Sequence, residues 1–170
     1  MGDGTVASTN SADDGMPPRP LPAFRGVTEL TLDAKGRLAV PTRYREALSA
    51  HGDGGLILTG DPSRCLLLYP RAVWEPIEAR LMAMSAFNEK VRRLQRLLVG
   101  HADDVDIDGS GRILVPPSLR AYARLEKDVV LVGQGHRFEV WDAAEWAAQT
   151  AQAIEFGAGG LPPELDGFSL

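Results

Sequence analysis

The sequence contains one cysteine, Cys65, and three histidines among 170 residues. A single thiol excludes an intrachain disulfide, so the fold must be held by its core, and a reducing compartment such as the cytoplasm is expected. Cys65 lies within an apolar run, where the expected role is that of a small buried side chain. His101 stands near two aspartates, but no second His or Cys has the spacing of a metal ligand. We therefore expect no metal site and no cofactor.

Long hydrophobic runs are also missing. No apolar run approaches the about 20 residues that a membrane span needs, and the N-terminus has no apolar segment of a signal peptide. No Ser or Cys nucleophile has a recognisable setting. Asp104–Gly109 fits the start of a calcium loop, yet Val115 occupies the position of the bidentate glutamate. The sequence thus argues against a membrane protein, an enzyme and a small-molecule substrate.

Basic residues are absent from one end of the chain. Residues 142–170 carry five acidic and no basic side chains, and residues 1–23 have a net charge of −2. The segment 24–141 has a net charge of +2, although the whole chain has −5. Acidic ends on a mildly basic body suit a DNA-binding protein with a local contact surface. Many enzymes have the same distribution of charge, so it does not by itself establish DNA binding.

The sequence does contain an internal repeat. The run from Asp33 to Arg45 recurs 75 residues later, from Asp108 to Arg120, and six of its thirteen positions are identical. A period of this length indicates two copies of one small unit. Each copy reads as strand, tight turn, strand, short helix, two strands and helix. Units of about 50–70 residues are too small to bury a generous core alone, so the two copies are expected to share one.

Turn residues give the repeat its local structure. Both Asp33-Ala34-Lys35-Gly36 and Asp108-Gly109-Ser110-Gly111 have Asp first and Gly fourth, as type I turns prefer. Pro41 and Pro116 are predicted to end the following strands and to open short helices. The other predicted elements are strands at 27–32, 37–40, 56–59, 66–69, 112–115, 129–132 and 138–141, and helices at 71–84, 88–99 and 143–156.

The helix at 88–99 is basic and amphipathic. Asn88 is a good N-cap, and the helical period predicts that Val91, Leu94 and Leu98 face inward. The remaining positions carry the cations Lys90, Arg92, Arg93 and Arg96. This basic face could follow DNA phosphates, or it could be a solvated face or a subunit contact.

The two turns carry the candidate functional residues, which are Lys35, Arg37, Ser110 and Arg112. Arginine can read guanine O6 and N7 in the major groove, and Lys and Ser suit phosphates or base edges. Because Lys35 corresponds to the uncharged Ser110, the two turns are expected to contact DNA unequally. The alternative is that the arginines only brace the turns, together with Asp33, Gly36, Asp108 and Gly111. Arg43, Arg45 and Arg120 follow the prolines and are left outside the candidate site.

These motifs resemble a known family. Phe24-Arg25-Gly26, the two Asp-x-x-Gly-Arg turns, Pro41–Arg45, Cys65–Pro70 and Phe138–Asp142 resemble MraZ, a family of bacterial transcription regulators. The resemblance covers residues 24–150. It implies an α+β fold of two tandem AbrB-like, swapped-hairpin β-barrel repeats that share a core, with packing helices. It also implies that the Asp-to-Arg motif contacts DNA and that chains assemble into rings.

The expected organisation has four parts. Residues 1–23 form a disordered extension, 24–99 the first repeat with its helix pair, 100–150 the second repeat, and 151–170 a frayed acidic tail. The expected function is a cytoplasmic, nucleoid-associated regulator that binds direct repeats of double-stranded DNA in its own promoter region and controls cell-division and cell-wall genes. The alternative is an oligomeric scaffold whose loops contact other subunits.

Overall fold

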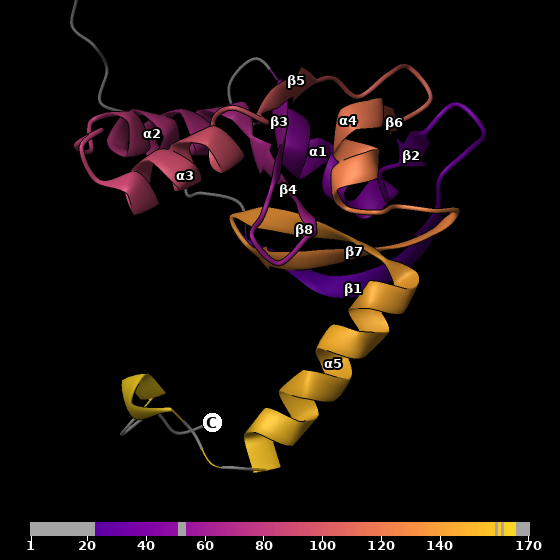
Figure 1. Ribbon diagram of the computed structural model, residues 1–170. Helices are drawn as coiled ribbons and strands as arrows, with labels where there is room; N and C mark the ends of the chain where they lie inside the picture. Colours follow the sequence, from indigo (N-terminus) through magenta and orange to yellow (C-terminus); the bar gives the residue numbers. More distant parts are fainter. Residues whose placement is uncertain (1–22, 51–53, 159, 161, 166–170) are drawn as a thin grey trace, which may run out of the picture.

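The computed structural model describes residues 23–50, 54–158, 160 and 162–165. The extension that the composition predicts to be disordered, residues 1–23, lies outside the described residues except for Ala23. The order of elements within each copy agrees with the prediction (Figure 1). The elements are β1 (Phe24–Thr31), β2 (Arg37–Ala39), α1 (Thr42–Ser49), β3 (Leu56–Gly60), β4 (Leu66–Pro70), α2 (Arg71–Met82), α3 (Glu89–Leu98), β5 (Asp103–Val105), β6 (Arg112–Leu114), α4 (Pro117–Tyr122), β7 (Asp128–Gly135), β8 (Arg137–Asp142), α5 (Ala143–Ala158) and a 3-10 turn (Pro163–Leu165).

The strands form a six-stranded antiparallel sheet whose order is symmetric about its centre. The order is β1-β7-β8-β4-β3-β5. Each copy therefore keeps its own hairpin, β3–β4 or β7–β8, and gives its first strand to the hairpin of the other copy. The two hairpins join at the centre through β4 and β8. This exchange gives the predicted α+β fold of two interleaved AbrB-like repeats.

The equivalent strands β2 and β6 of the two copies pair with each other in a separate two-stranded ribbon. Leu38 lies opposite Ile113, the equivalent residue of the other copy. At the ends of the ribbon, the amide of Val40 donates to the Gly111 carbonyl and the amide of Val115 donates to the Gly36 carbonyl, both at 2.9 Å. The backbone after each strand is thus tied to the turn of the other copy.

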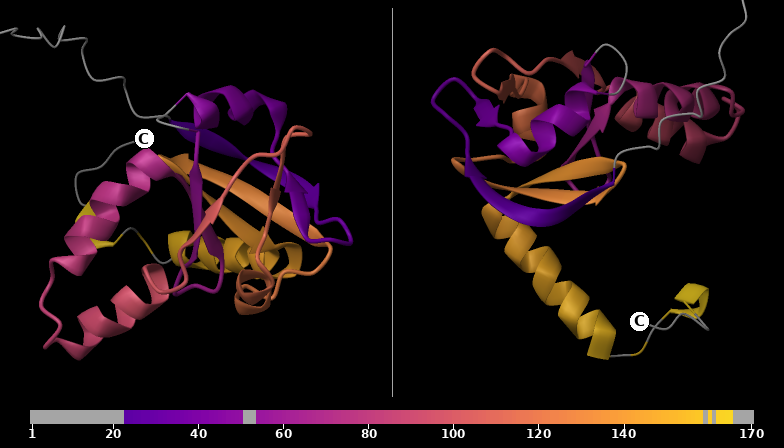
Figure 2. Two further views of the ribbon diagram at one scale, coloured as in Figure 1. Left: turned by 90° about the horizontal axis from the view of Figure 1, so that it is seen from above. Right: turned by 180° about the vertical axis from the view of Figure 1, so that it is seen from behind.

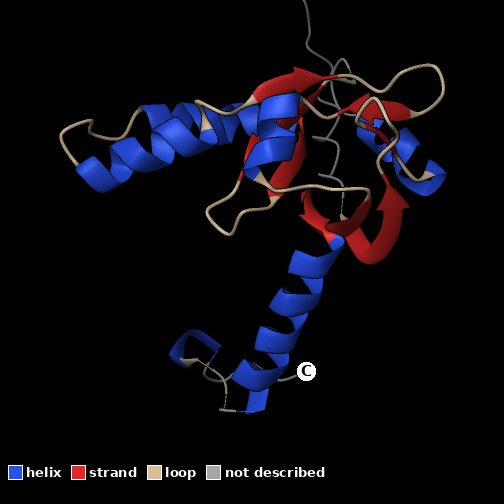
Figure 3. Cartoon of the chain, turned by 45° about the vertical axis from the view of Figure 1, so that its right-hand side comes forward, coloured by secondary structure: helices blue, strands red, loops and turns tan. Residues whose placement is uncertain are grey.

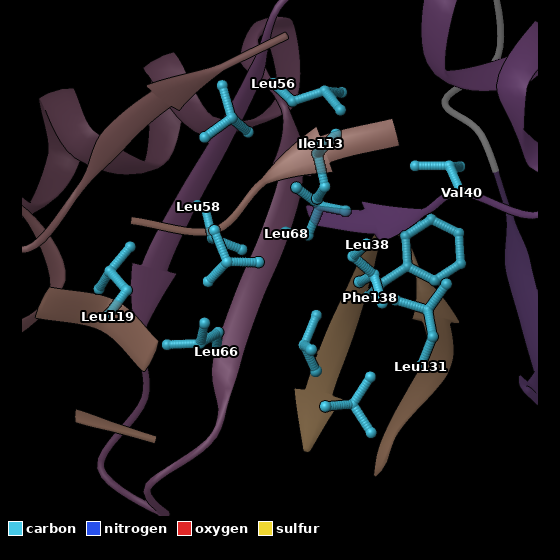
Figure 4. Packing of buried hydrophobic residues seen from close by; sticks show 14 of the residues in the cluster. Leu38, Val40, Leu56, Leu58, Leu66, Leu68, Ile113, Leu119, Leu131 and Phe138 are labelled. Carbon is cyan, nitrogen blue, oxygen red and sulfur yellow. The ribbon is translucent and has the colours of Figure 1, made fainter. Parts of the chain in front are cut away.

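The main core lies between the sheet and this ribbon and is built from both copies (Figure 4). Phe138 is fully buried at the centre of three aromatic rings. Its ring centroid lies 4.3 Å from that of Phe24 and 4.8 Å from that of Tyr44. Because Phe24 and Tyr44 come from the first copy and Phe138 from the second, the two copies fill one core, as their small size requires.

A second apolar cluster covers the other face of the sheet. Val73 and Trp74 of α2 pack there against side chains that include Tyr69 and Trp141. Cys65 belongs to this cluster, and burial raises the pKa of its thiol. Its role is therefore that of a small buried side chain, as predicted.

Two helical segments pack on the sheet at one end and extend beyond it. Figures 2 and 3 show the α2–α3 hairpin and α5 extending in different directions from the body.

The side chain of Asn88 accepts hydrogen bonds from the amides of Lys90 and Val91, which confirms the predicted N-cap of α3. The prediction that Leu94 faces inward is wrong, because this side chain is 42% exposed. The periodicity defines an apolar face, but the chain does not cover all of it.

The helix predicted at 143–156 is confirmed, and it extends into the predicted frayed tail, 151–170. Helix α5 continues to Ala158, and a 3-10 turn follows at Pro163–Leu165. Alanine has the highest intrinsic helix propensity, so this Ala-rich segment remains helical with little tertiary packing. Its side chains from 151 to 155 are exposed, including Ile154 at 70%.

Candidate nucleic-acid interface

The first turn is closed by a network centred on one carboxylate. Asp33 Oδ1 accepts hydrogen bonds from the amides of Lys35 and Arg37, both at 2.9 Å. Arg37 Nε donates to Asp33 Oδ2 at 2.6 Å. The amide of Gly36 donates to the Asp33 carbonyl at 2.9 Å. The hydrogen bonds that Asp33 accepts thus close the turn and fix the side chain of Arg37.

The second turn repeats the network atom for atom. Asp108 Oδ1 accepts from the amides of Ser110 and Arg112 at 2.9 Å, and Asp108 Oδ2 accepts from Arg112 Nε at 3.2 Å. The amide of Gly111 donates to the Asp108 carbonyl at 2.9 Å. The side chains of Lys35 and Ser110 are at equivalent exposed positions. The turns therefore differ in charge at their tips and agree in backbone geometry.

Hydrogen bonds keep both aspartates ionised. The pKa of Asp33 lies below its ordinary value, chiefly because the carboxylate accepts the Arg37 amide. The pKa of Asp108 is lowered in the same way by the Arg112 amide. A carboxylate that accepts several N–H groups is stabilised in its charged form. The hydrogen bonds thus strengthen a preference for the charged carboxylate, and both Asp–Arg pairs are ionic at neutral pH.

The ribbon brings the two arginines onto one surface. Arg37 lies opposite Leu114, and Arg112 lies opposite Ala39. These four residues share the face of the ribbon that points away from Leu38 and Ile113, because side chains alternate along a strand. Arg112 Nη1 also lies 4.0 Å from Asp33 Oδ2, so the two motifs touch. The Arg37 and Arg112 side chains are 29% and 32% exposed.

The turns lie on the opposite side of the molecule from the basic helix. In Figure 1 both turns lie at the upper right, whereas α3 lies at the left, and the view from behind in Figure 2 agrees. Within α3, Arg93 pairs with Glu89 at 2.8 Å. The structure therefore does not bring the basic face of α3 to the same surface as the turn residues.

Sequence reasoning left out two arginines that the structure brings to the turns. Arg120 lies against Gly36, and Arg45 lies against Gly111, each from the other copy. The two arginines occupy equivalent positions in the two copies, which was the sequence signal for a shared role. This equivalence could not reveal which turn each arginine would reach. Leu114, which is 54% exposed on the ribbon face, was also missed. The alternation of Leu114 with the buried Ile113 was the signal for it.

Other kinds of site find no support in the part of the chain that the structure describes. There, His, Cys, Asp and Glu side chains do not gather in any group of three or more suited to a metal ion. None of the described helices combines the length and the apolar character that a membrane crossing requires.

Comparison with known proteins agrees with this architecture. The family model described as "MraZ protein, putative antitoxin-like" matches the chain twice, at residues 23–97 and 98–158. The chain is 61% identical over 147 residues to a protein named Transcriptional regulator MraZ from Nitrosospira multiformis, which covers 86% of this chain and 99% of the relative. Proteins of the same name from Thiobacillus denitrificans and Legionella pneumophila are 55% and 50% identical, again over 86% of this chain and 99% of each relative.

Proposed function

The chain belongs to the MraZ family, and from this premise we propose that it is a transcriptional regulator that binds double-stranded DNA through its two duplicated turns. The observation that carries the proposal is the ribbon face on which Arg37 and Arg112 lie together, each oriented by an aspartate. Lys35 and Ser110 at the tips complete the proposed contact surface.

The Asp–Arg pairs support binding as well as bracing. Nε is the arginine atom that bonds the carboxylate in both turns. A guanidinium has five N–H donors in a planar fork, so donors are left for a guanine or a phosphate. The aspartate also fixes the side chain before DNA arrives, which lowers the entropy that binding would cost. Bracing and base reading are therefore compatible roles of the same residue.

The proposal extends to the target and the location. We propose that the protein binds direct repeats in its own promoter region and controls cell-division and cell-wall genes, in the cytoplasm at the nucleoid. Residues 24–99 and 100–150 serve as the two repeats, and neither a cofactor nor a small-molecule substrate is required. A single ribbon is a small footprint, since specific protein–DNA interfaces bury about 1,000–2,500 Å² of protein surface. Several chains acting together supply the larger interface.

We also propose that chains assemble into a ring-like homo-oligomer through the α2–α3 hairpin. The hairpin exposes several large apolar side chains, namely Met82, Met84, Phe87 and Leu94. Phe87 at its tip is fully exposed. Large apolar side chains exposed on one hairpin are typical of a surface that another chain covers. Each subunit then presents its turns to successive DNA repeats.

A second function is supported by the same surface features. The protein could be an oligomeric scaffold in which the turns meet other subunits, because the arginines are already paired with aspartates and the hairpin is apolar. In that function DNA is not a ligand. A DNA-binding experiment separates the two functions.

The direct test is binding of the full chain to a fragment of its promoter and to a scrambled fragment of equal length. We expect the promoter to be preferred, and we expect affinity to fall as salt rises because Lys and Arg displace counterions from phosphates. Moving one direct repeat by half a helical turn should weaken binding, because the second contact then faces the opposite side of the duplex. Equal affinity for both fragments, or no affinity, would favour the scaffold.

Assembly has its own test in the substitution Leu94→Asp. A carboxylate on the proposed subunit interface should be excluded from it, since burying an unpaired charge is costly. Light scattering at micromolar concentration should show a lower mass for Leu94→Asp than for the unchanged chain. The matched control is Ile154→Asp on α5, which should keep the assembled mass. A monomeric unchanged protein would contradict the proposal.

A further inference from the structure

We infer that Arg120 and Arg45 are positioning residues for the DNA-contacting turns, each acting on the turn of the other copy. Arg120 supports the first turn, Asp33–Gly36, and Arg45 supports the second turn, Asp108–Gly111. The inference rests on the proposed function only in that the turns are taken to contact DNA. The crossed support itself is a property of the fold.

The contact between arginine and turn is made at a glycine with no room for a side chain. Gly36 has φ of +79°, and a Cβ placed on it would lie 2.6 Å from both Cζ and Nη1 of Arg120. Gly111 has φ of +77°, and a Cβ there would overlap the Arg45 guanidinium still more closely. Each turn thus requires its glycine for two reasons. The backbone there is left-handed, and the guanidinium approaches too closely to leave room for a Cβ.

The exchange of strands makes this support cross from one copy to the other. Arg45 follows the first turn by nine positions in the chain, yet its guanidinium lies at Gly111 of the second turn. Backbone hydrogen bonds cross in the same direction, from Val40 to Gly111 and from Val115 to Gly36. Each turn is therefore held by the strand end and the short helix of the opposite copy.

The two supports differ in how firmly each arginine is anchored. Arg45 Nε donates to the Val40 carbonyl at 2.8 Å. Arg120 Nε is buried and has no hydrogen-bond partner among the described residues. Arg120 also lines a groove of about 390 Å³ beside the first turn, together with Asp33 and Lys127. The Nε atom of Arg45 is thus anchored to the backbone by a hydrogen bond, whereas the contact of Arg120 with the first turn is one of packing.

These contacts give both arginines an effect on binding without contact with a base. Removing the Arg120 guanidinium leaves the left-handed Gly36 without its neighbour, so the turn samples more conformations. Arg37 is fixed by the same turn through Asp33. Looser positioning of Arg37 then weakens reading of the base it faces. The charge of Arg120 alone cannot replace this effect, because the compact ammonium group of Lys would not cover Gly36 as the planar guanidinium does.

The deciding measurement is a set of double-mutant cycles on specific DNA affinity with the full chain. Arg120→Ala should weaken promoter binding by about 10-fold, within the range of coupling between residues of one network. In an Arg37→Ala background it should add almost nothing, whereas in an Arg112→Ala background it should keep its full effect. Arg45→Ala should show the reverse pattern. The inference would be overturned if Arg120→Ala had its full effect in both backgrounds. It would also be overturned if Arg120 were coupled to Arg112, its partner in the same copy, instead of to Arg37.

Two controls separate positioning from charge and from general destabilisation. Arg120→Lys keeps the charge and should remain as weak as Arg120→Ala in specific binding; full recovery with Lys would also overturn the inference. Arg25→Ala removes an exposed cation near the start of β1, at the other end of that strand from the first turn, and should leave specific affinity unchanged.

A DNA-free measurement keeps the inference separate from the proposed function. Amide hydrogen exchange followed by mass spectrometry should be faster at residues 33–37 in Arg120→Ala and faster at 108–112 in Arg45→Ala. If the unchanged protein does not bind its promoter, the DNA-binding proposal fails. The crossed pattern of amide hydrogen exchange in the two variants should still be observed. Faster exchange in the turn of the same copy, or in neither turn, would refute the crossed support.

Discussion

Replacing Arg37 with alanine is expected to weaken specific DNA binding by about 1–3 kcal/mol, as for an arginine that reads a guanine. The turn should stay closed, because Asp33 still accepts the amides of Lys35 and residue 37. Non-specific affinity should fall less, since it depends on the sum of cationic contacts with phosphates. Titration of promoter and scrambled fragments with the folded, assembled variant measures both quantities.

The matched comparison is Arg112→Ala, which removes the equivalent side chain of the second turn. We expect a loss of the same order but of different size, because the neighbouring tip residue is Ser110 in place of Lys35. The double variant should lose most of its preference for the promoter. Unchanged promoter affinity in a well-folded Arg37→Ala protein would show that Arg37 only braces its turn.

Replacing Phe138 with alanine is expected to destabilise the fold by about 3–5 kcal/mol, the cost of emptying a buried aromatic site. The ring is fully buried, with Phe24 and Tyr44 of the first copy packed on it. Its removal leaves a cavity where the two copies meet, so neither can compensate alone. This loss is a large share of the about 5–15 kcal/mol that stabilises a typical domain. Denaturant unfolding at fixed protein concentration measures the free energy of unfolding.

The control for this prediction is Ile154→Ala on the exposed part of α5. Ile154 is 70% exposed, so its truncation should change the free energy of unfolding by less than about 0.5 kcal/mol. A similar small effect for Phe138→Ala would mean that the core repacks around the missing ring, and the two copies would then be less interdependent than the structure indicates.

The sequence by itself determined the local features of this protein. Each turn could be predicted because Asp and Gly at fixed spacing form hydrogen bonds within four residues. The N-cap at Asn88 and the helix starts after Pro41 and Pro116 are equally local. The repeat of the Asp-to-Arg motif identified the candidate site, since both arginines reach their aspartates within the same turn.

Only the tertiary structure decided which copy each element serves. Two equivalent hairpins can accept either first strand, and the choice depends on contacts between residues far apart in the chain. No local pattern could show that β1 pairs with β7, or that Arg45 lies against Gly111 rather than Gly36. The exposure of Leu94 is of the same kind, because periodicity defines an apolar face but not what covers it. Each small copy buries little core alone, the observed core is shared by both copies, and the pairing of β2 with β6 brings Arg37 and Arg112 onto one surface.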